Sequence, residues 1–148
     1  MAFQLNQFKL TNQIGEVMNV NPSTLSIRLV STLSGTVKAG DALKFSASEA
    51  GDLPVMDKAA SADQAYAVVL FNAKKATYAA NDVVEVALAG SIVTMEASTA
   101  INRGTLVSWN SVSGKIQSTT TNHLGYTLDI ASASGDIVRV FIQPKLGS

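Results

Sequence analysis

His123 is the only histidine of the chain, and it is the first residue to test for catalysis. It follows a run of threonines and an asparagine, with Tyr126 and Asp129 shortly after it. A serine nucleophile needs a histidine base and an orienting acid, but no Gly-x-Ser-x-Gly turn is present to expose such a serine. His123 also has no second histidine or cysteine with which to hold a metal. We therefore expect a loop histidine, and we predict no enzyme, no cofactor and no metal site.

Carboxylates are the other side chains that could do chemistry. Four of them, Glu49, Asp52, Asp57 and Asp63, form a sparse acidic stretch. A calcium loop needs tightly alternating oxygen ligands, and this stretch lacks that spacing. Glycoside hydrolysis needs two carboxylates across one bond, but 11 scattered acids always offer some pair. We interpret the acidic stretch as solvated loops.

Composition describes a well-packed chain with few charges. Of 148 residues 47% are hydrophobic and only 15% are charged, against about 25% charged in a typical soluble domain. The net charge is zero and the only adjacent basic pair is Lys74 and Lys75, which argues against nucleic acid as a partner. Such a surface suits a protein that is packed in an assembly.

We expect no signal peptide and no membrane-spanning helix in this sequence. There is no cysteine and therefore no disulfide. The longest apolar run, 65–71, is far shorter than the ~20 residues of a membrane-spanning helix. The first residues have no basic segment followed by an apolar one, as a signal peptide would. We expect no membrane partner and assembly in a reducing cytoplasm.

Apolar residues alternate with polar ones from Thr24 onward, which is the pattern of half-buried strands. Clusters of Gly, Asn, Asp and Ser separate the runs and supply turns. Alanine-rich segments 47–64 and 73–80 have room for a helical turn. The pattern predicts an all-β fold, either a small β-barrel or a sandwich, with strands at 24–30, 41–46, 65–72, 82–89, 91–96, 104–109, 115–118, 124–130 and 136–143.

The second half of the chain repeats the first. Residues 91–142 echo 27–88 in the order of their turns and apolar runs, and the differences in length fall in loops. The repeat predicts two equivalent strand units, with Phe45 matched to Trp109 and Tyr66 to Tyr126. The matched segments are 38–45 with 102–109, Gly51 with Gly114, 65–68 with 125–128, and 81–86 with 135–140.

The same repeat predicts the core. In the last strand of each unit apolar residues alternate, so they share one face of the strand. Glu85 and Arg139 lie between them and should face solvent or an interface. The predicted core residues are Val84, Val86 and Leu88 in the first unit and Val138, Val140 and Ile142 in the second.

The second repeat also resembles a known family. Segments 104–109, 113–116, 124–126 and 135–140 are similar to the capsid cement, or head decoration, proteins of tailed bacteriophages. The resemblance covers about residues 25–143, with 39–88 as a looser copy of the unit. The chain departs from the family pattern by a longer first copy and by a Gln- and Asn-rich segment at 1–20.

The resemblance implies a small β-barrel protein, commonly a homotrimer, that binds the outside of an assembled phage head. Its partner would be the major capsid protein, and its place would be the capsid exterior of the virion, after assembly in the host cytoplasm. An alternative is a carbohydrate- or host-surface-binding module of a phage tail or fibre, which would use His123 and the loop aromatics.

Residues 1–20 have no counterpart in the repeat. Four large apolar residues, Phe3, Leu5, Phe8 and Leu10, alternate there with Gln and Asn. We predict that 1–20 form an N-terminal arm beside a duplicated barrel domain at 21–148. The four residues are then contacts to a neighbouring subunit or to the capsid. Alternatively, 1–20 contain the first strand of the barrel.

Overall fold

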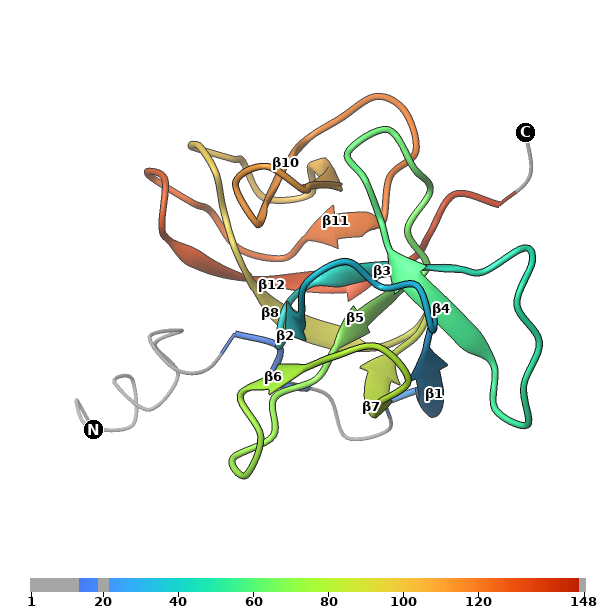
Figure 1. Cartoon of the computed structure of the whole chain (residues 1–148). Coiled ribbons are helices and arrows are strands. Elements are labelled where there is room, and N and C mark those ends of the chain that lie inside the picture. The colour runs from blue at the N-terminus through green and yellow to red at the C-terminus, as the bar shows by residue number, and fades with distance from the viewer. Residues whose placement is uncertain (1–13, 19–21, 147–148) are drawn as a thin grey trace.

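The protein is all-β. A computed structural model describes residues 14–18 and 22–146, and these contain twelve strands and no helix (Figure 1). The alanine-rich segments that had room for a helical turn are loops and strands instead. The strands are β1 (Thr24–Leu29), β2 (Val37–Lys38), β3 (Ala42–Phe45), β4 (Val55–Lys58), β5 (Ala67–Val69), β6 (Thr77–Tyr78), β7 (Val83–Ala87), β8 (Ile92–Glu96), β9 (Leu106–Asn110), β10 (Lys115–Ser118), β11 (Gly125–Thr127) and β12 (Ile137–Ile142).

Five strands of the first half, which we call the first unit, close into a barrel in the order β1-β4-β3-β5-β7. Strands β1 and β4 close it by running parallel to each other, whereas every other neighbouring pair is antiparallel. Its interior is filled by fully buried aliphatic side chains from alternate strand positions, including Ile27, Leu43 and Val86. The short strands β2 and β6 form a separate pair beside it.

The second unit is a five-stranded sheet in the order β10-β9-β11-β12-β8. Its strands pair as those of the first unit do, with β8, β9, β10, β11 and β12 in the places of β1, β3, β4, β5 and β7. Hydrogen bonds in the connections repeat as well. The amide of Gly40 donates to the carbonyl of Val69, and that of Gly104 donates to Thr127. The predicted duplication is therefore confirmed in its strand pairing.

The strand register corrects one of the predicted aromatic matches. Phe45 pairs with Met56 and Trp109 with Ile116, so these two aromatics are equivalent. Tyr66, however, donates its amide to Leu43 as Leu124 does to Val107. Tyr66 is therefore equivalent to Leu124, and Tyr126 is equivalent to Val68. The sequence match followed the shared tyrosine and slipped by two residues.

The environments of the equivalent aromatics also differ from the prediction. Phe45 is the last residue of β3 and has 45% of its surface exposed, whereas Trp109 is only 8% exposed. The first unit covers Trp109, but nothing in the described part of the chain covers Phe45 to the same degree. Phe45 instead packs against Tyr66, with ring centroids 5.6 Å apart.

One core is shared between the two units. Apolar residues on the outside of the barrel, among them Ala42, Val68 and Ala87, belong to the same buried cluster as Val93 and Val140 of the second sheet. The barrel thus covers one face of the sheet, and the two halves cannot separate without exposing this core. The predicted core residues are buried, except that Leu88 is only partly so.

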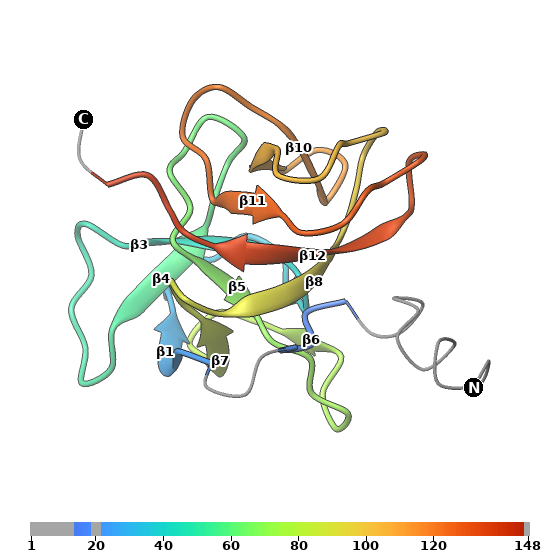
Figure 2. The ribbon, with the colours of Figure 1, turned by 180° about the vertical axis from the view of Figure 1, so that it is seen from behind.

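A segment ahead of the first strand pairs with the second unit. Val17 forms an antiparallel bridge to Val93 of β8, and Gly15 and Met18 donate amides to Thr94 and Ile92, each at 2.8 Å (Figure 2). Gly15 has a φ of +82° and touches the Val69 carbonyl, where a Cβ would lie 2.7 Å from the oxygen. Residues 14–18 of the predicted arm at 1–20 therefore pack on their own chain.

Candidate functional site

The residues considered for catalysis contact different partners. The ring of Tyr126 packs against Phe141, with centroids 5.3 Å apart. The carboxylate of Asp129 receives two hydrogen bonds from the Arg139 guanidinium, at 2.9 and 2.7 Å, and one from its amide at 2.8 Å. Among the residues that the structure describes, no hydrogen bond joins either of them to the His123 ring. The Ser-His-Asp arrangement considered for His123 is not assembled there.

The acidic residues serve ion pairs and turns. Glu49 pairs with Arg28 at 2.8 Å and Asp63 with Lys44 at 2.7 Å. These hydrogen bonds hold the pKa of each carboxyl below its usual value. Within 14–18 and 22–146 no three His, Cys, Asp or Glu residues gather as metal ligands would.

The Gly-Asp and Asn-Asp pairs of the repeat are turn devices. Asn81 and Gly135, at equivalent positions, adopt φ values of +68° and +96°, a region that favours Asn and Gly. The following Asp82 and Asp136 accept hydrogen bonds from the amides of the residues three positions earlier, at 2.8 and 3.2 Å. The conspicuous acids of the sequence pattern therefore fix the chain ahead of β7 and β12.

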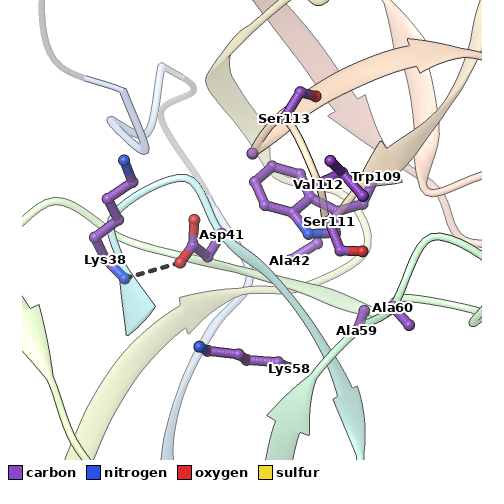
Figure 3. A pocket seen from close by; sticks show the side chains of 11 residues that line it. Lys38, Asp41, Ala42, Lys58, Ala59, Ala60, Trp109, Ser111, Val112 and Ser113 are labelled. Carbon is purple, nitrogen blue, oxygen red and sulfur yellow. Dashed lines mark hydrogen bonds between the residues drawn. The ribbon is translucent and has the colours of Figure 1, made fainter. Parts of the chain in front are cut away.

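A cleft of about 490 Å³ lies between the two units (Figure 3). Lys38, Asp41 and Lys58 come from the first unit, and Trp109 and the turn after it come from the second. Burial raises the pKa of Asp41 against the hydrogen bond from the Lys38 amide. The remaining lining is mostly alanine, serine and glycine. The cleft therefore places one carboxylate and two ammonium groups near Trp109, along the seam between the units.

A row of apolar side chains crosses the outer face of the second sheet. Cross-strand pairing places Leu106 beside Tyr126, Tyr126 beside Phe141, and Phe141 beside Ile92. Met18, whose amide bonds to Ile92, extends the row onto the edge segment. Leu106 and Met18 are 39% and 40% exposed, and the other three are half-buried. We call these five residues the outward row.

Sequence reasoning missed the outward row. The signal was present, because Tyr126 and Phe141 occupy strand positions that alternate with buried residues. The repeat matched Tyr126 to Tyr66 instead, and that match does not indicate that Tyr126 faces outward. The predicted contact residues Phe3, Leu5, Phe8 and Leu10 lie outside the residues that the structure describes.

The fold defines the class of protein first: an all-β protein made of two copies of one five-stranded unit with a shared core. Its particular family follows from comparison with known proteins. The sequence model of the phage cement protein family matches residues 20–142, which span both units. The chain belongs to the phage cement protein family. It is a structural protein associated with the phage head.

A solved structure has the same fold. It is the N-terminal base of the head fibre protein gp8.5 of bacteriophage phi29, with a TM-score of 0.58 and 19% identity over 86% of this chain and 100% of that one. No curated protein matches the chain. In the described residues, no helix has the length and hydropathy needed to cross a membrane.

Proposed function

We propose that the protein is a head decoration protein, which binds the outside of the assembled capsid, contacts the major capsid protein and stabilises the head. The observation that carries this proposal is the family match over residues 20–142. The low charge of the chain supports it, since a surface with few charged side chains is suited to burial in an assembly.

The shared core supports a mechanical role. Because the barrel covers one face of the second sheet, the two units form one body with buried side chains running through it. A body of this kind transmits load between the capsid subunits that it bridges without first unfolding a linker. This function needs no catalysis, and we propose that the protein is not an enzyme.

We further propose that the protein acts as a homotrimer. Three linked copies bind several capsid sites at once, so that modest single contacts give strong overall binding. The predicted arm at 1–20 would add contacts to a sister subunit or to the capsid through Phe3, Leu5, Phe8 and Leu10. Each of these side chains contributes about 1.5–3 kcal/mol when fully buried, before the cost of ordering the arm.

The experiment uses heads purified from a phage lacking this gene. Purified protein should bind them to a saturating, fixed ratio and raise the temperature at which they release DNA. A variant without residues 2–12 should stay folded but lose trimerisation or head binding, because the apolar arm residues are gone. A protein that binds glycans but not heads would instead support the alternative of a carbohydrate-binding module.

A further inference from the structure

The outward row occupies the same place in the second unit that a buried contact occupies in the first. In the barrel, Val68 pairs with Ala42 on one side and with Ala87 on the other. In the second sheet, Tyr126 pairs with Leu106 and Phe141 in the same order. The two rows are therefore equivalent by register.

The two equivalent rows differ in how far their side chains are exposed. Ala42, Val68 and Ala87 are at most 1% exposed, because the second sheet covers them. Leu106, Tyr126 and Phe141 have larger apolar side chains, yet within the described chain nothing covers them completely. The first unit thus shows that this face of the fold is one on which another unit packs. In the second unit, no part of the described chain fills that place.

A cation next to the outward row is paired within the chain. Arg139, two residues before Phe141 on β12, forms an ion pair with Asp129 at 2.7 Å. An apolar partner surface is therefore complementary to the row and need not neutralise this arginine.

We propose that the outward row is the surface through which this chain packs against a second copy of itself. The inference rests on the self-association that is part of the proposed function, and it assigns that association to Leu106, Tyr126, Phe141, Ile92 and Met18. Apolar patches shared by several strands are typical of such interfaces. Aromatic residues are the side chains that contribute most at their centre.

The test is the association state of the full chain in solution. Leu106→Lys and Phe141→Lys place a charge in the row, while Val112→Lys, at a hairpin tip that is 94% exposed, is the matched control. Sedimentation equilibrium from about 1 to 200 µM should show that the wild type and the control associate. Each row variant should raise the dissociation constant at least tenfold. Thermal melts at low concentration, where all are monomers, should show that the row variants stay folded.

Three outcomes would overturn the inference: a wild-type chain that stays monomeric throughout, row variants that associate as the wild type does, or row variants that lose only head binding. The last outcome would assign the row to the capsid. Head binding is measured separately, so the proposed function can fail while the self-association surface stands. A second measurement uses Leu106→Cys, which is the only cysteine in that variant because the chain has none. Bismaleimide cross-linking should capture copies through it but not through Val112→Cys.

Discussion

The two units have the same strand pairing and close in different ways. In the first, β1 and β4 pair in parallel over Arg28 and Leu29 and complete a barrel around its own core. In the second, the equivalent contact is a single parallel bridge between Ala97 and Ile116, and the sheet stays open. One face of this open sheet is covered instead by the outside of the barrel.

This difference shows how two copies of one unit can pack against each other through different faces. The first unit carries small residues, Ala42 and Ala87, on its outer face, which lies close to the second sheet. The second unit carries Leu106 and Phe141 at the equivalent positions, over which no other sheet of the described residues packs. The inward strand positions are mainly aliphatic in both units, apart from the equivalent Phe45 and Trp109, whereas the outward residues of these two pairs differ in side-chain size.

The sharpest way to break the comparison is to place the same charge at equivalent positions. Val68→Lys should destabilise the fold by about 3–5 kcal/mol or more, because an unpaired ammonium would be buried in the shared core. Tyr126→Lys should be tolerated far better, since its lysine can reach solvent. Urea unfolding followed by circular dichroism measures both. Equal losses would mean that the two rows are not differently covered.

A second test uses a tight backbone approach in the second unit, between Gly125 and Phe141. A Cβ at Gly125 would clash with the carbonyl oxygen of Phe141, whereas the equivalent Ala67 already has a Cβ. Gly125→Ala should therefore cost about 3 kcal/mol or more. The reciprocal change Ala67→Gly should cost about 1 kcal/mol through backbone entropy. A Gly125→Ala protein with wild-type stability would show that β11 and β12 leave room for a Cβ at this position.

The shared core predicts joint unfolding of the two units. Val140→Ala in the second unit and Val86→Ala in the first should each cost about 1–3 kcal/mol through lost burial and a cavity. Because the units share buried residues, both variants should still unfold in one calorimetric transition. Two separate transitions, with only one of them moved by each variant, would indicate independent units. If either variant lost only about a few tenths of a kcal/mol, the valine would lie on the exposed face of its strand and not on the buried one.

The smallest expected effect is on stability at low pH, and it comes from the ion pair between Asp129 and Arg139 in the second unit. The Arg139 guanidinium lowers the pKa of Asp129, as Lys44 lowers that of Asp63. A lowered folded-state pKa gives stability that is present above the unfolded value of about 3.9 and is lost as pH falls through the folded value. Burial raises the pKa of Asp41, which acts in the opposite sense.

We therefore expect wild-type stability to fall below about pH 4. Asp129→Asn should cost about 1 kcal/mol at pH 7, a modest figure because Arg139 is partly exposed. The variant should also lose less than the wild type on acidification. Melting temperatures measured from pH 2.5 to 7 test this, with Asp52→Asn as a control. An unchanged pH profile in Asp129→Asn would show that this pair does not contribute.

Much of the fold could be predicted from the sequence, because turn residues and alternation record the strand order. The match of Asp82 to Asp136 was right, since both perform the same turn function. The match of Tyr66 to Tyr126 was wrong, because side-chain identity on a strand surface does not fix hydrogen-bond register. Gly51 shows the same limit. Unlike Gly114 it has no positive φ, and it belongs to a longer loop.

The shared core was not predictable in the same way. Nothing local distinguishes Val68, which is covered by the second sheet, from Val69, which faces the barrel interior. Only the three-dimensional relation of the two units decides which alternate positions are outside. The candidate contact surface was missed for the same reason, because an alternating strand looks alike whether its second face is solvated or docked.

The short segment that pairs with β8 has a consequence for solubility. An uncovered edge strand offers its free amide and carbonyl groups to any passing strand, including one from a half-folded copy of the same protein. The bridge between Val17 and Val93, together with the hydrogen bonds at Gly15 and Met18, occupies much of that edge. Occupying this edge early would keep newly made copies from joining strand to strand before they reach the head.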